Sequence, residues 1–166
     1  MLDPNTDKPI RVFPSHLPPL QAIGIHIRHG DKKIESKLHE FNEYLDAAIL
    51  LSERHGFARN IILSTDNERI IEAIENDKSS RRGFTFYYTT FKRINDWGSP
   101  IQTAHKTGVI NFVLNSFANL ILGTHPCIMG FVQTTSSNWN RLINELRKTD
   151  GRRANAPSID LEYGEN

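Results

Sequence analysis

The strongest constraint on the fold is an alternation of short apolar segments with longer segments of helical periodicity. The series begins at Gln21–Arg28, where isoleucines at positions 23, 25 and 27 give the alternating β-branched pattern of a buried strand. Further strands are predicted at Asn60–Leu63, Phe84–Tyr88 and Leu120–Leu122, and helices at Lys37–His55, from Ser64–Asn67 to about Asp77, at Thr103–Asn119 and at Ser136–Arg147. Strands that alternate with helices favour an α/β, Rossmann-like parallel sheet with helices on both faces.

The length of 166 residues fits a single domain. Residues 1–20 contain five prolines and no periodic pattern, so we expect them to form an extended lead. No repeat or low-complexity segment divides the remainder. Residues 21–166 are therefore expected to form one Rossmann-like lobe.

The charge balance excludes some classes of partner. Twenty basic and nineteen acidic residues give a formal net charge of +1, so we expect neither nucleic-acid binding nor attraction to an anionic membrane. No apolar run approaches the ~18 residues of a membrane span, and the start lacks the pattern of a signal peptide. We therefore expect a soluble chain without membrane contact. A single cysteine, Cys127, excludes an intrachain disulfide and a cysteine-cluster metal site.

Ligands of open α/β sheets bind beyond the carboxyl ends of the strands, where the strand order reverses. This rule selects three segments of the sequence. They are Arg28–Glu35, Ser64–Asn67 and Thr134–Asn138.

The first segment has the side chains that a phosphate site needs. Arg28 can hold a phosphate in a bidentate manner, and Lys32 can add a second, mobile positive charge. Asp31 is short enough to fix Arg28 or to cap the local backbone. Glu35 is a candidate to take the proton of an acceptor hydroxyl. The alternative is a solvated charged loop that follows His26, a hydrogen-bonded core residue.

The third segment combines hydroxyl groups with the expected start of a helix. The side chains of Ser136, Ser137 and Asn138, the free backbone N–H groups and the helix dipole together predict an anion site. An ordinary helix cap is the alternative interpretation. A metal site is not expected, because His26 and His29 are three residues apart and would lie on opposite faces of a strand.

Several motifs together resemble the α-1,6-fucosyltransferases that modify the N-glycan core. The segment from His26 to Lys32, followed by Glu35, resembles that family's H-x-R-R-x-D-K…E. Three further stretches agree in order: Ile62–Asn67 with L-A-T-D-D, Thr107–Leu122 with a G-V-I-L-D…A-D-F-L-V helix and strand, and Thr134–Asn138 plus Arg141 with T-F-S-S-Q…R. Ser158–Asp160 is similar to S-L-D, so the resemblance covers about residues 23–160.

The resemblance implies the C-terminal lobe of a GT-B glycosyltransferase, without its N-terminal lobe. Such a lobe binds GDP-fucose without a metal or other cofactor, and the full enzyme transfers fucose with inversion to a glycan or glycoprotein in the Golgi. Catalytic roles would fall to Glu35 as general base and to Arg28 and Lys32 at the phosphates. The implied donor-binding residues are His26 at the guanine, Arg28, Asp31, Asp66, Asn111, Ser136, Ser137 and Asn138.

The chain departs from the family pattern at several points. His29 replaces a second arginine, Asn111 replaces an aspartate that recognises guanine, and the loop before Glu35 is one residue shorter. Extra residues also follow Leu122. Two other functions stay open: a nucleotide-sugar-binding lobe without activity, and a histidine phosphatase, whose R-H-G motif is similar to Arg28-His29-Gly30.

Overall fold

The computed structural model describes residues 21–29, 38–77, 79–89, 109–149, 151 and 155–165. The elements in chain order are β1 (Ala22–Ile27), α1 (Phe41–His55), β2 (Asn60–Thr65), α2 (Glu68–Asn76), the short 3-10 helix η2 (Ser79–Arg81), β3 (Thr85–Tyr87), α4 (Val109–Gly123), β4 (Ile128–Gln133), α5 (Asn138–Thr149), β5 (Ser158–Asp160) and β6 (Gly164–Glu165). The expected extended lead, residues 1–20, lies outside the described residues.

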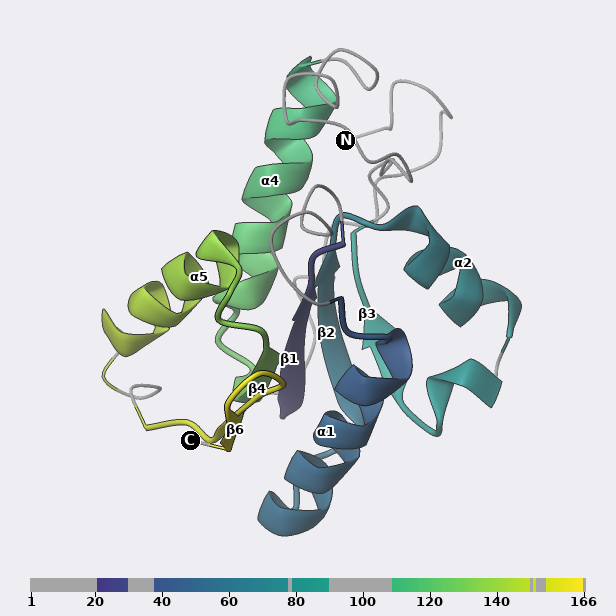
Figure 1. The fold of residues 1–166 in the computed structure, drawn as a ribbon, viewed down its shortest axis with the longest axis vertical. Coiled ribbons are helices and arrows are strands. Elements are labelled where there is room, and N and C mark those ends of the chain that lie inside the picture. The colour runs from purple at the N-terminus through teal and green to yellow at the C-terminus, as the bar shows by residue number, and fades with distance from the viewer. Residues whose placement is uncertain are drawn as a thin grey trace.

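The strands form one six-stranded sheet in the order β3-β2-β1-β4-β5-β6 (Figure 1). All neighbouring pairs from β3 to β5 are parallel, and only β6 runs antiparallel to its neighbour. The chain builds outward from β1 through β2 to β3, and then returns to the other side of β1 with β4 and β5. The strand order therefore reverses between β1 and β4, which is where Rossmann-like sheets have their ligand crevice.

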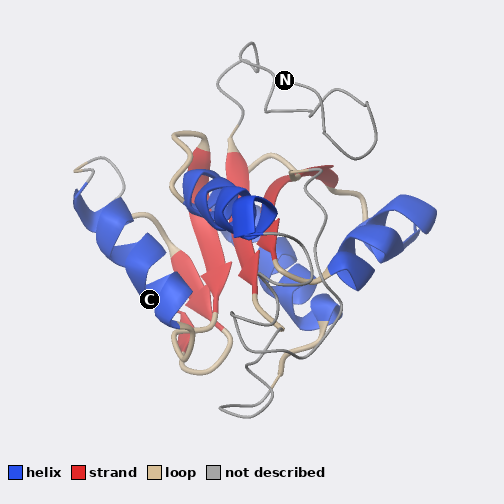
Figure 2. Cartoon of the chain, turned by 90° about the horizontal axis from the view of Figure 1, so that it is seen from above, coloured by secondary structure: helices blue, strands red, loops and turns tan. Residues whose placement is uncertain are grey.

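Helices cover both faces of the sheet, which confirms the predicted α/β class (Figure 2). The helices α1 and α2 pack on one face over isoleucines 23, 25 and 27 of β1. The helices α4 and α5 cover the other face, where Leu122 and Ile143 pack against Phe131 of β4. The odd and even positions of β1 thus serve different layers, as the alternating pattern of a strand requires.

The predicted strand at Leu120–Leu122 is wrong, because these residues form the last turn of α4. Asn119 and Leu122 are buried, whereas Phe117 and Ile121 are exposed, and this three- to four-residue spacing is that of a helix. A run of three apolar residues fits either structure when it is judged by hydrophobicity alone. The strand at this place in the sheet is β4, which falls within the residues that have no counterpart in the fucosyltransferase pattern.

The remaining predicted elements are present with small shifts at their ends, except that the predicted start of the helix Thr103–Asn119 lies outside the described residues. The helix α1 begins at Phe41, four residues later than predicted, and ends before Gly56, which has the positive φ of 67° that suits a glycine. The longest helices of the described part, α1 and α4, have 15 residues each. Within those described ranges, none is long and apolar enough to cross a bilayer.

Candidate functional site

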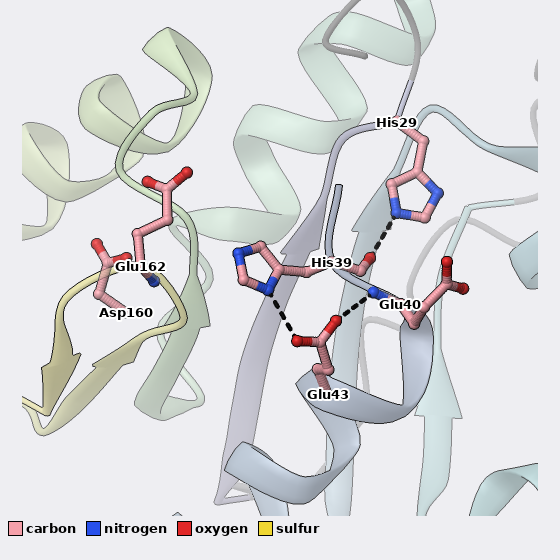
Figure 3. A network of polar contacts seen from close by, with 6 residues as sticks. All are labelled: His29, His39, Glu40, Glu43, Asp160 and Glu162. Carbon is pink, nitrogen blue, oxygen red and sulfur yellow. Dashed lines mark hydrogen bonds and ion pairs between the residues drawn. The ribbon is translucent and has the colours of Figure 1, made fainter. Parts of the chain in front are cut away.

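The candidate site is the carboxyl edge of the sheet around the reversal between β1 and β4. The described residues that follow β1, β2 and β4 meet at this edge because all three strands are parallel. They belong to the three segments that the sequence selects, of which positions 30–35 lie outside the described residues. The start of α1 and the turn after β5 also reach this edge, and neither was predicted to do so (Figure 3).

His29 ties the end of β1 to the end of β2. Its backbone N–H donates to Oδ1 of Asp66 at 3.0 Å, and the side-chain amide of Asn67 lies 2.9 Å from its Nδ1. Its other ring nitrogen, Nε2, is 2.9 Å from the carbonyl oxygen of His39. The amide donates to Nδ1 and Nε2–H donates to the carbonyl, so both ring nitrogens of His29 are engaged. Asp66 thereby holds the backbone of His29 at the end of β1.

His26 is buried beneath α4. Its Nδ1 is 2.7 Å from the hydroxyl oxygen of Ser64, which also donates to the carbonyl oxygen of Asn119 at 3.4 Å. Only 2% of His26 is exposed. Its position matches the alternative interpretation of a hydrogen-bonded core histidine.

Two carboxylates hold the loop that follows β4. The backbone N–H of Thr135 donates to Oδ2 of Asp160 at 3.1 Å, and that of Ser136 donates to Oε2 of Glu162 at 2.7 Å. Asp160 is buried and also accepts from the backbone N–H of Glu162 at 2.9 Å. These loop amides are therefore occupied by carboxylates of the same chain. The sequence offered little sign of this contact, since the residues it joins are 25 and 26 positions apart.

Ser137 stands immediately before the first residue of α5. It is buried, and its hydroxyl has no hydrogen-bond partner in the part of the chain that the structure describes. Asn138 begins the helix and is exposed. A buried hydroxyl costs free energy unless it is hydrogen-bonded, so the oxygen of Ser137 is a candidate ligand contact at a helix N-terminus.

Tyr44 of α1 lies among three carboxylates at the same edge. Burial raises the pKa of its phenol, a side-chain hydrogen bond with Thr134 lowers it, and the charges of Glu162, Glu43 and Asp66 raise it further. The net effect is a pKa well above the ordinary value, so the phenol is neutral at physiological pH. Tyr44 therefore acts as a neutral hydrogen-bonding group at this edge.

Next to Tyr44, His39 and Glu43 form a second polar group. Nδ1 of His39 is 3.1 Å from Oε1 of Glu43, and the backbone N–H of Glu40 donates to Oε2 of Glu43 at 2.6 Å. Figure 3 places His39 between Glu43 and the turn that carries Asp160 and Glu162. This pair was not predicted from the sequence as a site feature, although its four-residue spacing at the start of a helix is visible there.

The other predicted residues are distributed as follows. Arg28 is half-buried at the end of β1, next to His29. Asp31, Lys32 and Glu35 lie outside the described residues, as does the side chain of Asn111, whose backbone belongs to α4. Among the described side chains, no three histidine, cysteine, aspartate or glutamate residues are grouped to hold a metal ion.

No protein-family model matches this chain, and no curated protein matches it. The interpretation of the site therefore depends on its geometry and on the sequence motifs.

Proposed function

We propose that this chain binds the diphosphate of GDP-fucose at the reversal between β1 and β4 and takes part in fucosyl transfer. The proposal is carried by one observation, the buried hydroxyl of Ser137 without a described partner at the N-terminus of α5, beside the reversal. A phosphate oxygen would accept a hydrogen bond from this hydroxyl and interact favourably with the helix dipole. Arg28, at the end of the adjacent strand β1, would supply the opposing positive charge.

The chemistry of the proposed transfer follows from the leaving group. GDP leaves as an anion, so fixed positive charge at the diphosphate stabilises the charge that develops in the transition state. Arg28 and, by the resemblance, Lys32 would have this role. The transfer would be inverting and metal-independent, and the resemblance makes Glu35 a candidate for the general base that takes the proton of the glycan hydroxyl. We also propose that the chain is the C-terminal lobe of a GT-B glycosyltransferase and that it acts in the Golgi.

Asp160 and Glu162 favour a second candidate function. Their carboxylates already occupy the amides of Thr135 and Ser136 and add negative charge beside the proposed phosphates. A lobe of this kind would bind a nucleotide sugar weakly without turning it over. The third candidate, a histidine phosphatase, is disfavoured because its nucleophile needs a ring nitrogen that faces the substrate, and both ring nitrogens of His29 are engaged.

Release of GDP distinguishes the first two candidates. The chain would be incubated with GDP-fucose and an N-glycan acceptor, with GDP release and fucosylated product both measured. A UDP-sugar would serve as the matched donor control. If the chain transfers fucose, GDP and fucosylated product should both form with GDP-fucose as the donor, and neither should form with the UDP-sugar. Donor binding without GDP release would support the binding lobe, and equal turnover of the UDP-sugar would contradict a GDP-fucose site.

A further inference from the structure

His39 and Glu43 form a hydrogen-bonded pair for which the proposed function has no role yet. Nδ1 of His39 lies 3.1 Å from Oε1 of Glu43, which is one helical turn further along the chain. Because an ionised carboxylate only accepts hydrogen bonds, Nδ1 carries the proton of the neutral imidazole and Nε2 carries the lone pair. A histidine oriented in this way by a carboxylate has the arrangement of a general base.

Both members of the pair are fixed by further contacts. Only 6% of His39 is exposed, its ring stands edge-on to that of Tyr44 with the centroids 6.4 Å apart, and its carbonyl oxygen accepts from His29. The second carboxylate oxygen of Glu43 accepts from the backbone N–H of Glu40. A group held in this way keeps its orientation when a substrate binds, which proton transfer requires.

The lone pair of His39 is directed away from Glu43. Figure 3 shows the ring reaching toward the turn that carries Asp160 and Glu162, with the nitrogen that is not bonded to Glu43 on that side. The hydrogen bonds that His39 makes with described residues involve its Nδ1 and its carbonyl oxygen. This turn also holds the loop after β4, so Nε2 faces the edge of the sheet where the proposed donor would bind.

We propose that His39 is the proton acceptor of this site and that Glu43 positions it; this inference rests on the proposed function. The oxygen of the acceptor hydroxyl forms a bond to C1 of fucose, and its proton passes to Nε2 of His39. The bond from C1 to the β-phosphate oxygen breaks, and its electron pair leaves with GDP. Glu43 stabilises the imidazolium that results. The resemblance assigns the same proton to Glu35, so an experiment must compare the two residues.

The first test measures GDP release at saturating GDP-fucose together with the dissociation constant of GDP. His39→Gln is expected to lower the rate on the order of a hundredfold or more, as loss of a general base does, with GDP affinity within about twofold of wild type. His55→Gln is the matched control, because His55 is exposed at the opposite end of α1. Glu35→Gln is measured in parallel, and the inference predicts a smaller loss of rate for it than for His39→Gln.

Four outcomes are informative. A rate within about twofold of wild type for His39→Gln, with a large loss for Glu35→Gln, would overturn the role of His39 and leave the proposed function intact. If the wild type binds GDP but releases none from GDP-fucose, the proposed proton transfer would be overturned, and the nucleotide-sugar-binding lobe without activity would be supported. Absence of GDP binding would overturn the proposed function itself. A larger loss in His39→Gln than in Glu35→Gln, with GDP affinity kept, would support the inference.

A spectroscopic test covers the case in which His39→Gln does not fold. Nitrogen-15 NMR of the neutral His39 ring in the wild-type protein should show the tautomer with the proton on Nδ1. Glu43→Gln should shift this population toward the Nε2–H tautomer and lower the rate of GDP release more than it changes the KM. Glu53→Gln, an exposed site on the same helix, is the control. An Nε2–H tautomer in the wild type would contradict the proposal.

Discussion

The side chains of Tyr44 and Thr134 share a hydrogen bond, and this contact joins the first turn of α1 to the residue that follows β4. The two residues are far apart in the sequence and meet at the reversal of strand order. The bond links α1, which bears Glu43 and follows His39, with the loop that leads to Ser137. It therefore fixes the two sides of the candidate site relative to each other.

Tyr44→Phe tests this contact through stability. At pH 8 the variant should lose about 0.5–1.5 kcal/mol of unfolding free energy, the usual contribution of one hydrogen bond. Burial raises the folded-state pKa of Tyr44 above its unfolded value of about 10, so the unfolded state binds fewer protons at higher pH and stability falls as pH rises. Wild type should therefore lose more stability than the variant between pH 8 and pH 11.

Urea unfolding at the two pH values measures this difference. Tyr163→Phe is the control. Because Tyr163 is exposed, this variant should have nearly the same unfolding free energy as wild type at both pH values. Equal losses of unfolding free energy for wild type and Tyr44→Phe between pH 8 and pH 11 would contradict a raised pKa of Tyr44 in the folded state.

Gly24→Ala tests the packing that brings β1 next to β4. A Cβ at position 24 would lie 2.5 Å from Cδ2 of Phe131 and 2.8 Å from Cδ1 of Ile128. We expect a destabilisation of about 1–3 kcal/mol, as for other overpacked cores, measured by urea unfolding. Gly151→Ala is the control because a Cβ there meets no atom within 4 Å. Equal stability of the two variants would show that this layer is less tightly packed.

Much of the fold could be predicted from sequence because β1, α1, β2 and α5 carry long or strongly periodic patterns. The strand β4 was missed because Gly130 and the partly exposed Met129 interrupt its apolar pattern. The strands β5 and β6 have only three and two residues and carry no period of their own.

The site was predictable only in part for a different reason. The three strand ends follow from the order of the elements, and the parallel sheet brings them together. The hydrogen bonds of Asp160 and Glu162 with the loop after β4, and the direction of Nε2 in His39, depend on tertiary contacts. Neither periodicity nor motif spacing contains that information.

Glu162→Gln tests whether the carboxylate beside the loop opposes anion binding. Glutamine keeps an oxygen that can accept from the N–H of Ser136 but removes the negative charge. If a diphosphate binds here, its affinity should increase about threefold to tenfold, since like charges in a partly solvated site repel by about 1 kcal/mol. Glu53→Gln, on the exposed side of α1, should leave the affinity unchanged. Weaker GDP binding by Glu162→Gln would place the diphosphate elsewhere.

The most direct test of a GDP-sugar site between β1 and β4 is calorimetric titration of the chain with GDP, UDP and ADP. We expect GDP to bind most tightly and Arg28→Ala to weaken GDP binding on the order of ten- to a hundredfold, as expected for a lost charged hydrogen bond. Arg59→Ala is the matched control, because Arg59 precedes β2 at the opposite edge of the sheet. GDP binding no tighter than that of ADP, or unchanged by Arg28→Ala, would contradict a GDP-sugar site between β1 and β4.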